Sequence, residues 1–348
     1  MTDDRRRDLE PLAPEDAVEM FLDSKEAEDI ADSTDYNYRG RLESFLVFCE
    51  EEGIENINNL TGRDLHNFRN KRLKGKLDGY ESIKKVSLHS NLKTVQDFLT
   101  FCWEVDACPK EMRQKVPLPT LTDEEEVRDE MLDPGRAKEI LNYLERHRYA
   151  SREHVVFMIL WHTGRRIGGL RALDVDDFDA EDGYLHFQHR PESDTPLKND
   201  KKSEGYIAVG DFECEVIEDW IKLHRPATTD DYGRRPLIST NKGRAHGGTI
   251  RTDIYRITQP CEYTGECPHG KEPPTCEFRK RNALAKCPSS RSPHRLRDGR
   301  LTKHRMEGDP KDVVSDRTDA SEEVIDKHYD QRSEFQKMQT RREFLDNV

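Results

Sequence analysis

Apolar residues recur at helical spacing through the N-terminal part of this chain, and this pattern limits its fold more than any other feature. One helical face, at positions i, i+4, i+7, i+8 and i+11, consists of Tyr38, Leu42, Phe45, Leu46 and Cys49. A second face consists of Leu88, Leu92, Val95, Phe98, Leu99 and Cys102. Between them, Thr61 precedes Asp64 in an order typical of a capping box. No strand pattern interrupts these stripes, so we expect a small all-helical domain over residues 15–107.

A change of composition separates this region from a second domain. Residues 1–14 form a charged tail, and the stretch 108–130 carries prolines followed by an acidic run, "KVPLPTLTDEEEVRDE", which is typical of an interdomain linker. Asp133 then offers an N-cap, with Pro134 at the first helical position. We therefore expect a second domain over residues 131–348.

The second domain combines helices with a small β-sheet. An apolar run from Val155 to Trp161 predicts a buried helix, and "GYLHFQ" (183–188) and "GYIAVG" (205–210) predict two short strands of a hairpin. A polar segment that contains several lysines joins the two strands. Further helices are expected over residues 211–223, 294–306 and 310–316 and from about residue 331. The predicted fold is mostly α with a small β-sheet, of the α+β class.

Charge is distributed unevenly along the chain. The 348 residues carry a formal net charge of -13, and 36% of them are charged, which is typical of a well-solvated surface. Between Arg279 and Arg305, however, ten Lys and Arg residues accompany a single acidic residue, Asp298. A basic segment of this kind in an acidic protein suits a polyanion such as nucleic acid.

No part of the sequence predicts export or membrane insertion. The start, "MTDDRRRDLEP", lacks the apolar stretch of a signal peptide, and the longest apolar run, Val155 to Trp161, is too short to cross a bilayer. We expect a cytoplasmic protein without a membrane partner. In that compartment the eight cysteines are not expected to form disulfides.

Three separated stretches carry side chains suited to phosphate chemistry. The first, "HTGRRIGGLRALDVDDFD" (162–179), places arginines directly after a Thr-Gly turn. The second, "PHRLRDGR" (293–300), places arginines beside a histidine, and the third, "VIDKHYDQR" (324–332), holds a tyrosine in a polar setting. A guanidinium fork matches the oxygens of a phosphate and stays charged at physiological pH. Each stretch alone is a common surface feature, whereas the three together in this order are more specific.

In this order the stretches resemble the motifs of the tyrosine recombinase family, the phage-type integrases. Arg166 in "TGRRI" matches the first arginine of that family, and His294 and Arg297 in "HRLR" match its His-x-x-Arg pair. Tyr329 lies about thirty residues beyond that pair, at the place of the family's nucleophile. The resemblance covers roughly residues 15–345. It implies a helical core-binding domain, a catalytic domain, and cleavage and rejoining of DNA through a 3′-phosphotyrosine intermediate.

The resemblance also implies a role for each side chain. Arg166 and Arg297 would clamp the phosphate and neutralise the charge that develops on its non-bridging oxygens, without a catalytic metal or a nucleotide. Tyr329 would attack the phosphate and form a covalent bond that conserves the energy needed for rejoining. His294 would hold the phosphate or move a proton.

In this family a lysine at the tip of a β-hairpin is the general acid that protonates the 5′ leaving oxygen. Here the hairpin segment reads "PLKNDKKSEGYIAV", and Lys198 matches the family position best. Lys201 and Lys202 are alternatives, because this loop is longer than usual.

The sequence departs from the family pattern at three positions. Gly169 stands where a Glu often follows the first arginine, and Asp298 replaces a His after the second. Ala320 stands nine residues before Tyr329, where the family commonly has His or Trp. These changes leave an alternative function open: a regulatory or architectural protein that keeps the fold and binds DNA but has lost catalysis. A type IB topoisomerase and a zinc-ribbon interaction module without enzyme chemistry are further alternatives.

Double-stranded DNA is the partner that the resemblance implies, bound between the helical domain and the catalytic domain. Two or four copies would assemble on paired sites. The charged helix expected over residues 331–345 is a candidate contact between neighbouring copies.

Four of the eight cysteines fall within 27 residues that are rich in Pro, Gly and charge, where no apolar core could hold the chain. They are spaced Cys-x5-Cys-x8-Cys-x10-Cys and comprise Cys261, Cys267, Cys276 and Cys287. Four thiolates around a structural Zn²⁺ would supply the missing stability. Because the spacing is not the usual C-x2-C pair, unliganded thiols and a redox or iron–sulfur role remain alternatives.

Overall fold

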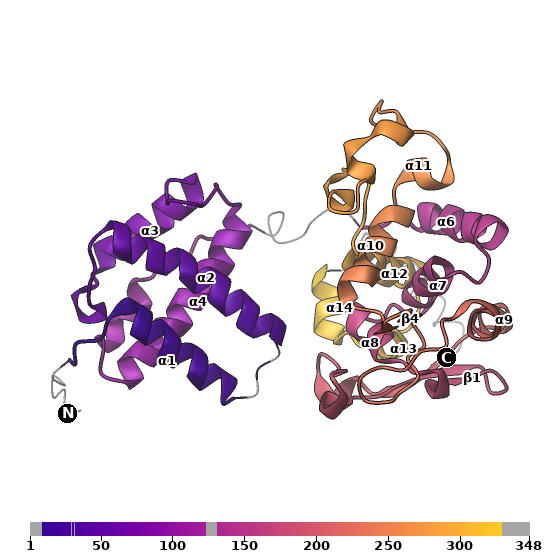
Figure 1. Ribbon diagram of the computed structural model, residues 1–348, viewed down its shortest axis with the longest axis horizontal. Coiled ribbons are helices and arrows are strands. Elements are labelled where there is room, and N and C mark those ends of the chain that lie inside the picture. Colours follow the sequence, from indigo (N-terminus) through magenta and orange to yellow (C-terminus); the bar gives the residue numbers. More distant parts are fainter. Residues whose placement is uncertain (1–8, 29, 31, 123–130, 329–348) are drawn as a thin grey trace, which may run out of the picture. The chain divides into compact units, whose positions relative to one another are not determined.

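Two compact units, Met1–Arg128 and Asp129–Val348, make up the chain (Figure 1). The computed structural model describes residues 9–28, 30, 32–122 and 131–328. Tyr329 and the helix expected from residue 331 lie outside the described residues. None of the helices within the described ranges is long and apolar enough to cross a membrane.

The first unit is built from helices whose apolar faces meet in one core. Its described elements are α1 (Pro14–Glu26), α2 (Asp32–Glu51), η1 (Ile57–Asn59), α3 (Gly62–Lys74), α4 (Lys85–Glu104) and the 3₁₀ turn η2 (Lys110–Lys115). Helix α2 buries Leu42, Phe45 and Cys49, and α4 buries all six residues of its predicted face. Phe45 meets Phe68 edge-on, with 5.3 Å between ring centroids. The predicted all-helical fold of this region is confirmed.

Local sequence signals explain where α3 begins and where the first core ends. Thr61 and Asp64 form the predicted capping box, in which the Thr61 N–H donates to the Asp64 carboxylate at 2.8 Å. Met112 and Val116 lie in the stretch expected as linker, yet both are buried in the first core, where η2 packs against α4. The first of the residues assigned to the linker are therefore part of the helical unit.

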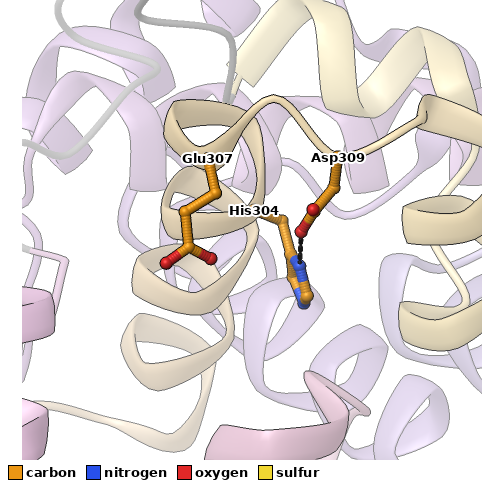
Figure 2. A group of neighbouring side chains, drawn as sticks. All are labelled: His304, Glu307 and Asp309. Atoms are coloured by element: carbon orange, nitrogen blue, oxygen red, sulfur yellow. Dashed lines mark hydrogen bonds and ion pairs between the residues drawn. The ribbon is translucent and has the colours of Figure 1, made fainter.

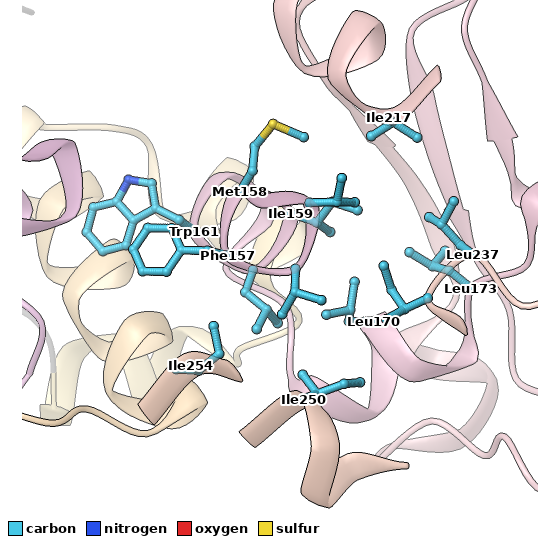
Figure 3. Close-up of a cluster of buried hydrophobic side chains, with 14 of the residues drawn as sticks. Phe157, Met158, Ile159, Trp161, Leu170, Leu173, Ile217, Leu237, Ile250 and Ile254 are labelled. Carbon is cyan, nitrogen blue, oxygen red and sulfur yellow. The ribbon is translucent and has the colours of Figure 1, made fainter. Parts of the chain in front are cut away.

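The second unit surrounds one buried helix, α7. Its helices are α6 (Pro134–His147), α7 (Arg152–Thr163), α8 (Ile167–Ala172), α9 (Asp211–Asp219), α10 (Gly247–Ile257), α11 (Pro260–Tyr263), α12 (Pro293–Glu307), α13 (Lys311–Thr318) and α14 (Glu322–His328). Helix α7 contacts α6, α8, α9, α10 and α12. Figure 3 shows Phe157, Met158 and Ile159 leaving α7 in different directions into this core. A helix that is apolar on every side is stable only when other elements cover it all round.

Two small antiparallel sheets complete the second unit. Their strands are β1 (Phe178–Asp179), β2 (Tyr184–Phe187) and β3 (Gly205–Ala208) in one sheet, and β4 (Ser239–Thr240) and β5 (Gly243–Arg244) in the other. The predicted hairpin is β2–β3, in which Leu185 pairs with Ile207 and both are buried. His186 and Tyr206 stack on the opposite face, 4.0 Å apart. The predicted fold, mostly α with a small β-sheet, is confirmed.

The imidazole of His154 makes the stability of the second unit depend on pH. His154 lies in the first turn of α7, and its Nδ1 accepts a hydrogen bond from the Ala150 N–H at 3.3 Å. Burial lowers the pKa of His154 from 6.5 to about 4. Between pH 6.5 and about 4, the imidazole of the unfolded chain binds a proton that the folded ring does not bind. The stability from this group is therefore complete above pH 6.5 and is lost as the pH falls toward 4.

We expect His154 to remove about 3 kcal/mol from the free energy of unfolding as the pH falls through this window. His154→Gln keeps an oxygen that can accept the Ala150 hydrogen bond but cannot bind the proton. It should therefore lower the slope of the unfolding free energy against pH by the contribution of about one proton. Denaturant unfolding at a series of pH values measures this slope, and an NMR titration gives the pKa directly. An imidazole that titrates near its ordinary pKa would contradict the burial argument.

Candidate phosphate site

Helix α7 ends in a glycine turn that presents two arginines to the following helix. Gly164 has φ +64°, and a Cβ on it would lie 2.8 Å from the Thr318 Cγ2, so this turn requires glycine. Arg165 follows directly, and Arg166 is the N-cap residue of α8. The Thr-Gly turn of the sequence motif thus packs against the end of α13.

Arg297 reaches the same turn from α12. It is only 3% exposed, and its Nη1 donates to the Gly164 carbonyl at 2.7 Å and also to the Thr318 carbonyl. Its Nη2 donates to the Asp319 carbonyl at 3.0 Å. A buried guanidinium is stable only when its N–H groups find acceptors, and here backbone oxygens of two turns supply them.

Arg166 meets Arg297 at Asp319. The Arg166 Nη1 donates to the Asp319 carbonyl at 2.9 Å and forms a close ion pair with the Asp319 carboxylate. The structure therefore brings together the two arginines that the motifs single out, although they lie on elements far apart in the sequence. Asp319 follows α13 with φ +56°, a left-handed conformation that Asp tolerates better than most residues.

The carboxylate of Asp319 also binds the segment between β2 and β3. Ser203 Oγ donates to it at 2.8 Å, and Asn199 Nδ2 donates at 3.1 Å. The sequence pattern singled out only the adjacent Ala320, and it gave no signal for these contacts of Asp319. Ala320 itself is buried in a small apolar cluster with Leu301.

Arg165 precedes Arg166 and has no role in the family motif, and its contacts are structural. Its Nη1 donates to the Ser203 carbonyl at 2.8 Å, its Nε to the Arg317 carbonyl at 3.0 Å and its Nη2 to the Asp316 carbonyl at 3.1 Å. The guanidinium also lies 5.0 Å from the centre of the Phe187 ring. Burial lowers the pKa of Arg165. Its contacts fix the lysine-bearing segment and α13 to the same turn.

His294 stands on the first turn of α12 at the edge of this site. Its side chain is 64% exposed, and its Nε2 lies 3.6 Å from an oxygen of the Asp298 carboxylate. The pKa of His294 is lowered, mainly because nearby protein atoms partly withdraw the ring from water. The positive charges of Arg295, Arg297 and Arg166 add to this shift, whereas Asp298 opposes it. A neutral imidazole can both donate and accept a hydrogen bond.

The three candidate lysines are exposed, and they differ in what they face. Lys202 lines an open cavity of about 970 Å³ together with Arg165, Arg166 and Asp319. Lys198, which matches the family position best, is not among the residues that line this cavity. Lys201 and Lys202 lie in the 3₁₀ turn η5 (Asp200–Ser203). Of the three, Lys202 is the one that lines the cavity of the two arginines, and the geometry favours it.

Residues 130–266 match the family described as the phage integrase family. The second unit of the chain therefore contains a region of the phage integrase family. The matched stretch contains Arg166 and the three lysines and ends before His294. Among curated proteins, none matches the chain in sequence.

Solved integrase structures share the fold of this chain. The Tn1549 transposon integrase, in complex with a circular intermediate DNA, is 13% identical with a TM-score of 0.68, over 96% of this chain and 99% of that one. A lambda integrase (75–356) dimer bound to a COC′ core site is 13% identical with a TM-score of 0.60, over 93% and 98%. A lambda integrase tetramer bound to a Holliday junction is 13% identical with a TM-score of 0.59, over 88% and 77%. At this level of identity the similarity shows the fold alone.

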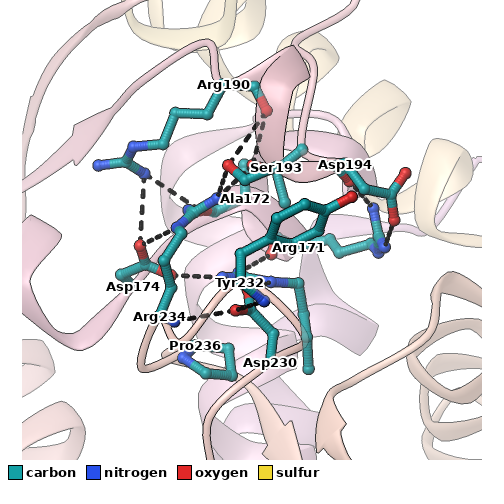
Figure 4. Close-up of polar contacts among 12 residues, drawn as sticks. Arg171, Ala172, Asp174, Arg190, Ser193, Asp194, Asp230, Tyr232, Arg234 and Pro236 are labelled. Carbon is teal, nitrogen blue, oxygen red and sulfur yellow. Dashed lines mark hydrogen bonds and ion pairs between the residues drawn. The ribbon is translucent and has the colours of Figure 1, made fainter.

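A buried ion-pair network anchors the base of the lysine-bearing segment (Figure 4). Arg234 donates to the Asp174 carboxylate at 2.7 Å, to Ser193 Oγ at 2.5 Å and to Thr195 Oγ1 at 2.8 Å. Arg244 pairs with the other oxygen of Asp174 at 2.5 Å. The network thus joins the loops around β4 and β5 to the segment that carries Lys202.

Polar contacts and the buried side chain of Leu284 hold the cysteine-rich segment. Figure 1 shows this segment (orange) at the end of the second unit that is remote from β1. Arg136 donates to the Ser289 carbonyl at 3.1 Å, and Gln259 donates to the Phe278 carbonyl at 3.0 Å. Burial raises the pKa of the Cys261 thiol, which Arg279 partly opposes. Within the described ranges, which include all four cysteines, no three sulfur atoms lie within 4.8 Å of one another. The predicted zinc site therefore rests on the spacing of the four cysteines in the sequence.

One group of metal-ligating side chains, His304, Glu307 and Asp309, does lie together in the described part of the chain (Figure 2). The His304 Nδ1 is 2.5 Å from the Asp309 carboxylate, and the Arg300 Nε donates to its Nε2 at 3.0 Å. Both ring nitrogens are therefore engaged, and neither offers a lone pair to a metal. This group closes the C-terminal end of α12.

The network around Asp174 predicts unequal effects for two neighbouring arginines. Arg234→Ala removes the donor to one oxygen of the buried Asp174 carboxylate and to the hydroxyls of Ser193 and Thr195, while Arg244 still pairs with the other oxygen, so it should lower the free energy of unfolding by about 2 kcal/mol. The matched control is Arg235→Ala, because Arg235 pairs with Asp176 in solvent and should contribute less than about 1 kcal/mol. Urea unfolding measures both values, and hydrogen exchange should show faster opening of residues 190–204 in Arg234→Ala alone. Equal effects of the two variants would show that the network does not anchor the segment.

Proposed function

We propose that this integrase-family protein cleaves and rejoins DNA through a covalent 3′-phosphotyrosine bond formed by Tyr329. The observation that carries the proposal is the convergence of Arg166 and Arg297 on Asp319. Two guanidinium groups directed at one point provide the positive charge that a phosphodiester needs when a nucleophile attacks it. The order of the motifs and the match of residues 130–266 to the phage integrase family support the same reaction.

Each remaining residue takes a role that its environment permits. The lowered pKa of His294 keeps its imidazole neutral near pH 7, so it can hold a phosphate oxygen by a hydrogen bond or accept a proton. Lys202, or Lys198 after a shift of the exposed loop, protonates the leaving 5′ oxygen. No nucleotide or catalytic metal enters this scheme.

Duplex DNA is the proposed partner, bound by a dimer or tetramer of the protein. The lambda integrase structures contain a dimer on a core site and a tetramer on a Holliday junction, which supports such assemblies here. Lys280, Arg281 and Lys286 are exposed in the cysteine-rich segment and are available for phosphate contacts. A protein that acts on the DNA of the cell works inside it, which agrees with the expected cytoplasmic location.

A DNA-binding protein of the same fold without catalysis is the second candidate. It is favoured by Ala320, whose methyl side chain offers no polar group to a phosphate, and by the ion pair of Asp319 with Arg166. The reaction and the binding-only function differ in one observable, a covalent link between protein and DNA.

Covalent trapping separates the two candidates. With nicked or half-site DNA the wild-type protein should give a band of protein joined to DNA after denaturation, and Tyr329→Phe should abolish it because the nucleophile is gone. Arg166→Ala should lower the rate of trapping by about 10² to 10³. Tyr232→Phe removes the hydroxyl of an exposed tyrosine outside the site and should leave the band unchanged. DNA that is bound without any covalent band would favour the binding-only function.

The four-cysteine zinc site stays a prediction and has its own test. If Cys261, Cys267, Cys276 and Cys287 close around a structural Zn²⁺, the purified protein should contain about one zinc per chain. Cys276→Ser should lower this content and the thermal stability, whereas Cys214→Ser changes a cysteine of α9 and should leave the zinc content unchanged. Protein without zinc that keeps the same melting temperature after metal addition would exclude the site.

A further inference from the structure

We infer that the Asp319 carboxylate occupies the seat of the scissile phosphate, and that Ser203 and Asn199 are phosphate-binding residues alongside Arg166. The inference rests on the proposed function, because it names further ligands of the same site. In this state the integrase blocks its own site with an internal anion, which DNA must displace.

The donors around the Asp319 carboxylate are those that a phosphate requires. One oxygen receives the Arg166 guanidinium and the Ser203 hydroxyl at 2.8 Å, and the other receives the Asn199 amide at 3.1 Å. A carboxylate and a phosphate share this preference for a guanidinium and neutral N–H or O–H donors. The Asp319 side chain is 14% exposed, so the contacts are partly shielded from water.

The seat is accessible from outside the protein. Arg166, Asn199, Lys202, Asp319 and Tyr206 all line the same open cavity of about 970 Å³. A phosphate that enters there meets Arg166 first, because one third of its side chain is exposed whereas Arg297 is almost fully buried.

A phosphate and the ionised Asp319 cannot share these donors, since like charges repel at such short range. The side chain can leave while the turn stays in place, because the Asp319 carbonyl is held separately by Arg166 and Arg297. A change of side-chain rotamer therefore suffices to open the seat. The Asp319 carboxylate therefore competes with a DNA phosphate. When the phosphate binds, Ser203 and Asn199 donate their hydrogen bonds to it instead of to the carboxylate.

The test measures DNA binding in a Tyr329→Phe background, where no chemistry can occur. The probe is a short, fluorescently labelled duplex of random sequence, followed by anisotropy. Asp319→Asn should tighten binding by about tenfold, because it removes a like charge from the seat. Asp319→Gly is the second variant, since glycine adopts the left-handed backbone of this position freely and the fold is kept. Asp312→Asn, an exposed residue on α13, makes the same change in net charge outside the cavity and should alter binding less than twofold.

Ser203→Ala decides whether the vacated seat is the phosphate site. Added to Asp319→Asn, it should reverse most of the gain in affinity, because it removes one donor to the phosphate. Equal effects of Asp319→Asn and Asp312→Asn would overturn the inference, and so would a gain that Ser203→Ala leaves unchanged. If these affinities change as expected while the wild-type protein gives no covalent band, the catalytic proposal fails and the anion seat stands.

Discussion

The turn at Thr318 and Asp319 is held by arginines rather than by an apolar core, and the site depends on this interaction. Arg297 bonds to the carbonyls of Thr318 and Asp319 and to that of Gly164, which ties the end of α13 to the end of α7. A guanidinium has five donors in a fixed plane, so it can join several backbone segments at once. Loss of one such group would leave several carbonyls unpaired in a buried place, which is costly. The same group that the motif marks as a phosphate ligand therefore also builds the site.

The surrounding fold serves to keep these turns in register. Helix α7 is buried on all sides, so its C-terminal end has a fixed position from which Arg165 and Arg166 extend. Helix α12 packs on α7 and brings Arg297, while the β2–β3 connection brings Ser203. Arg165 bonds to that connection and to α13 together. Strands β2 and β3 are short, so polar contacts between the elements, rather than an extended sheet, fix the positions of these side chains.

The sequence predicted the parts of this arrangement that depend on local patterns. The apolar faces of α2 and α4, the Asp133 cap and the buried run in α7 follow from periodicity and capping, which act within a few residues. Arg166, His294 and Arg297 were found because each has a recognisable local motif. The ion pair of Arg166 with Asp319 was not found, because no spacing rule links a residue before α8 to one after α13. The two-residue strands β4 and β5 are likewise too short to give a period.

In the long connection between β2 and β3, matching the sequence to the family did not identify the lysine that faces the site. Matching to the family selected Lys198, yet the cavity beside the arginines is lined by Lys202. In a loop longer than usual, counting residues from a strand no longer fixes which side chain faces inward. Position is set instead by tertiary contacts, here the bonds of Arg165 and Asp319 to Ser203. Because Ser203 directly follows Lys202, the hydroxyl that holds the Asp319 carboxylate also fixes the place of the lysine. Exchange of that carboxylate for a phosphate would therefore keep Lys202 beside the bound anion.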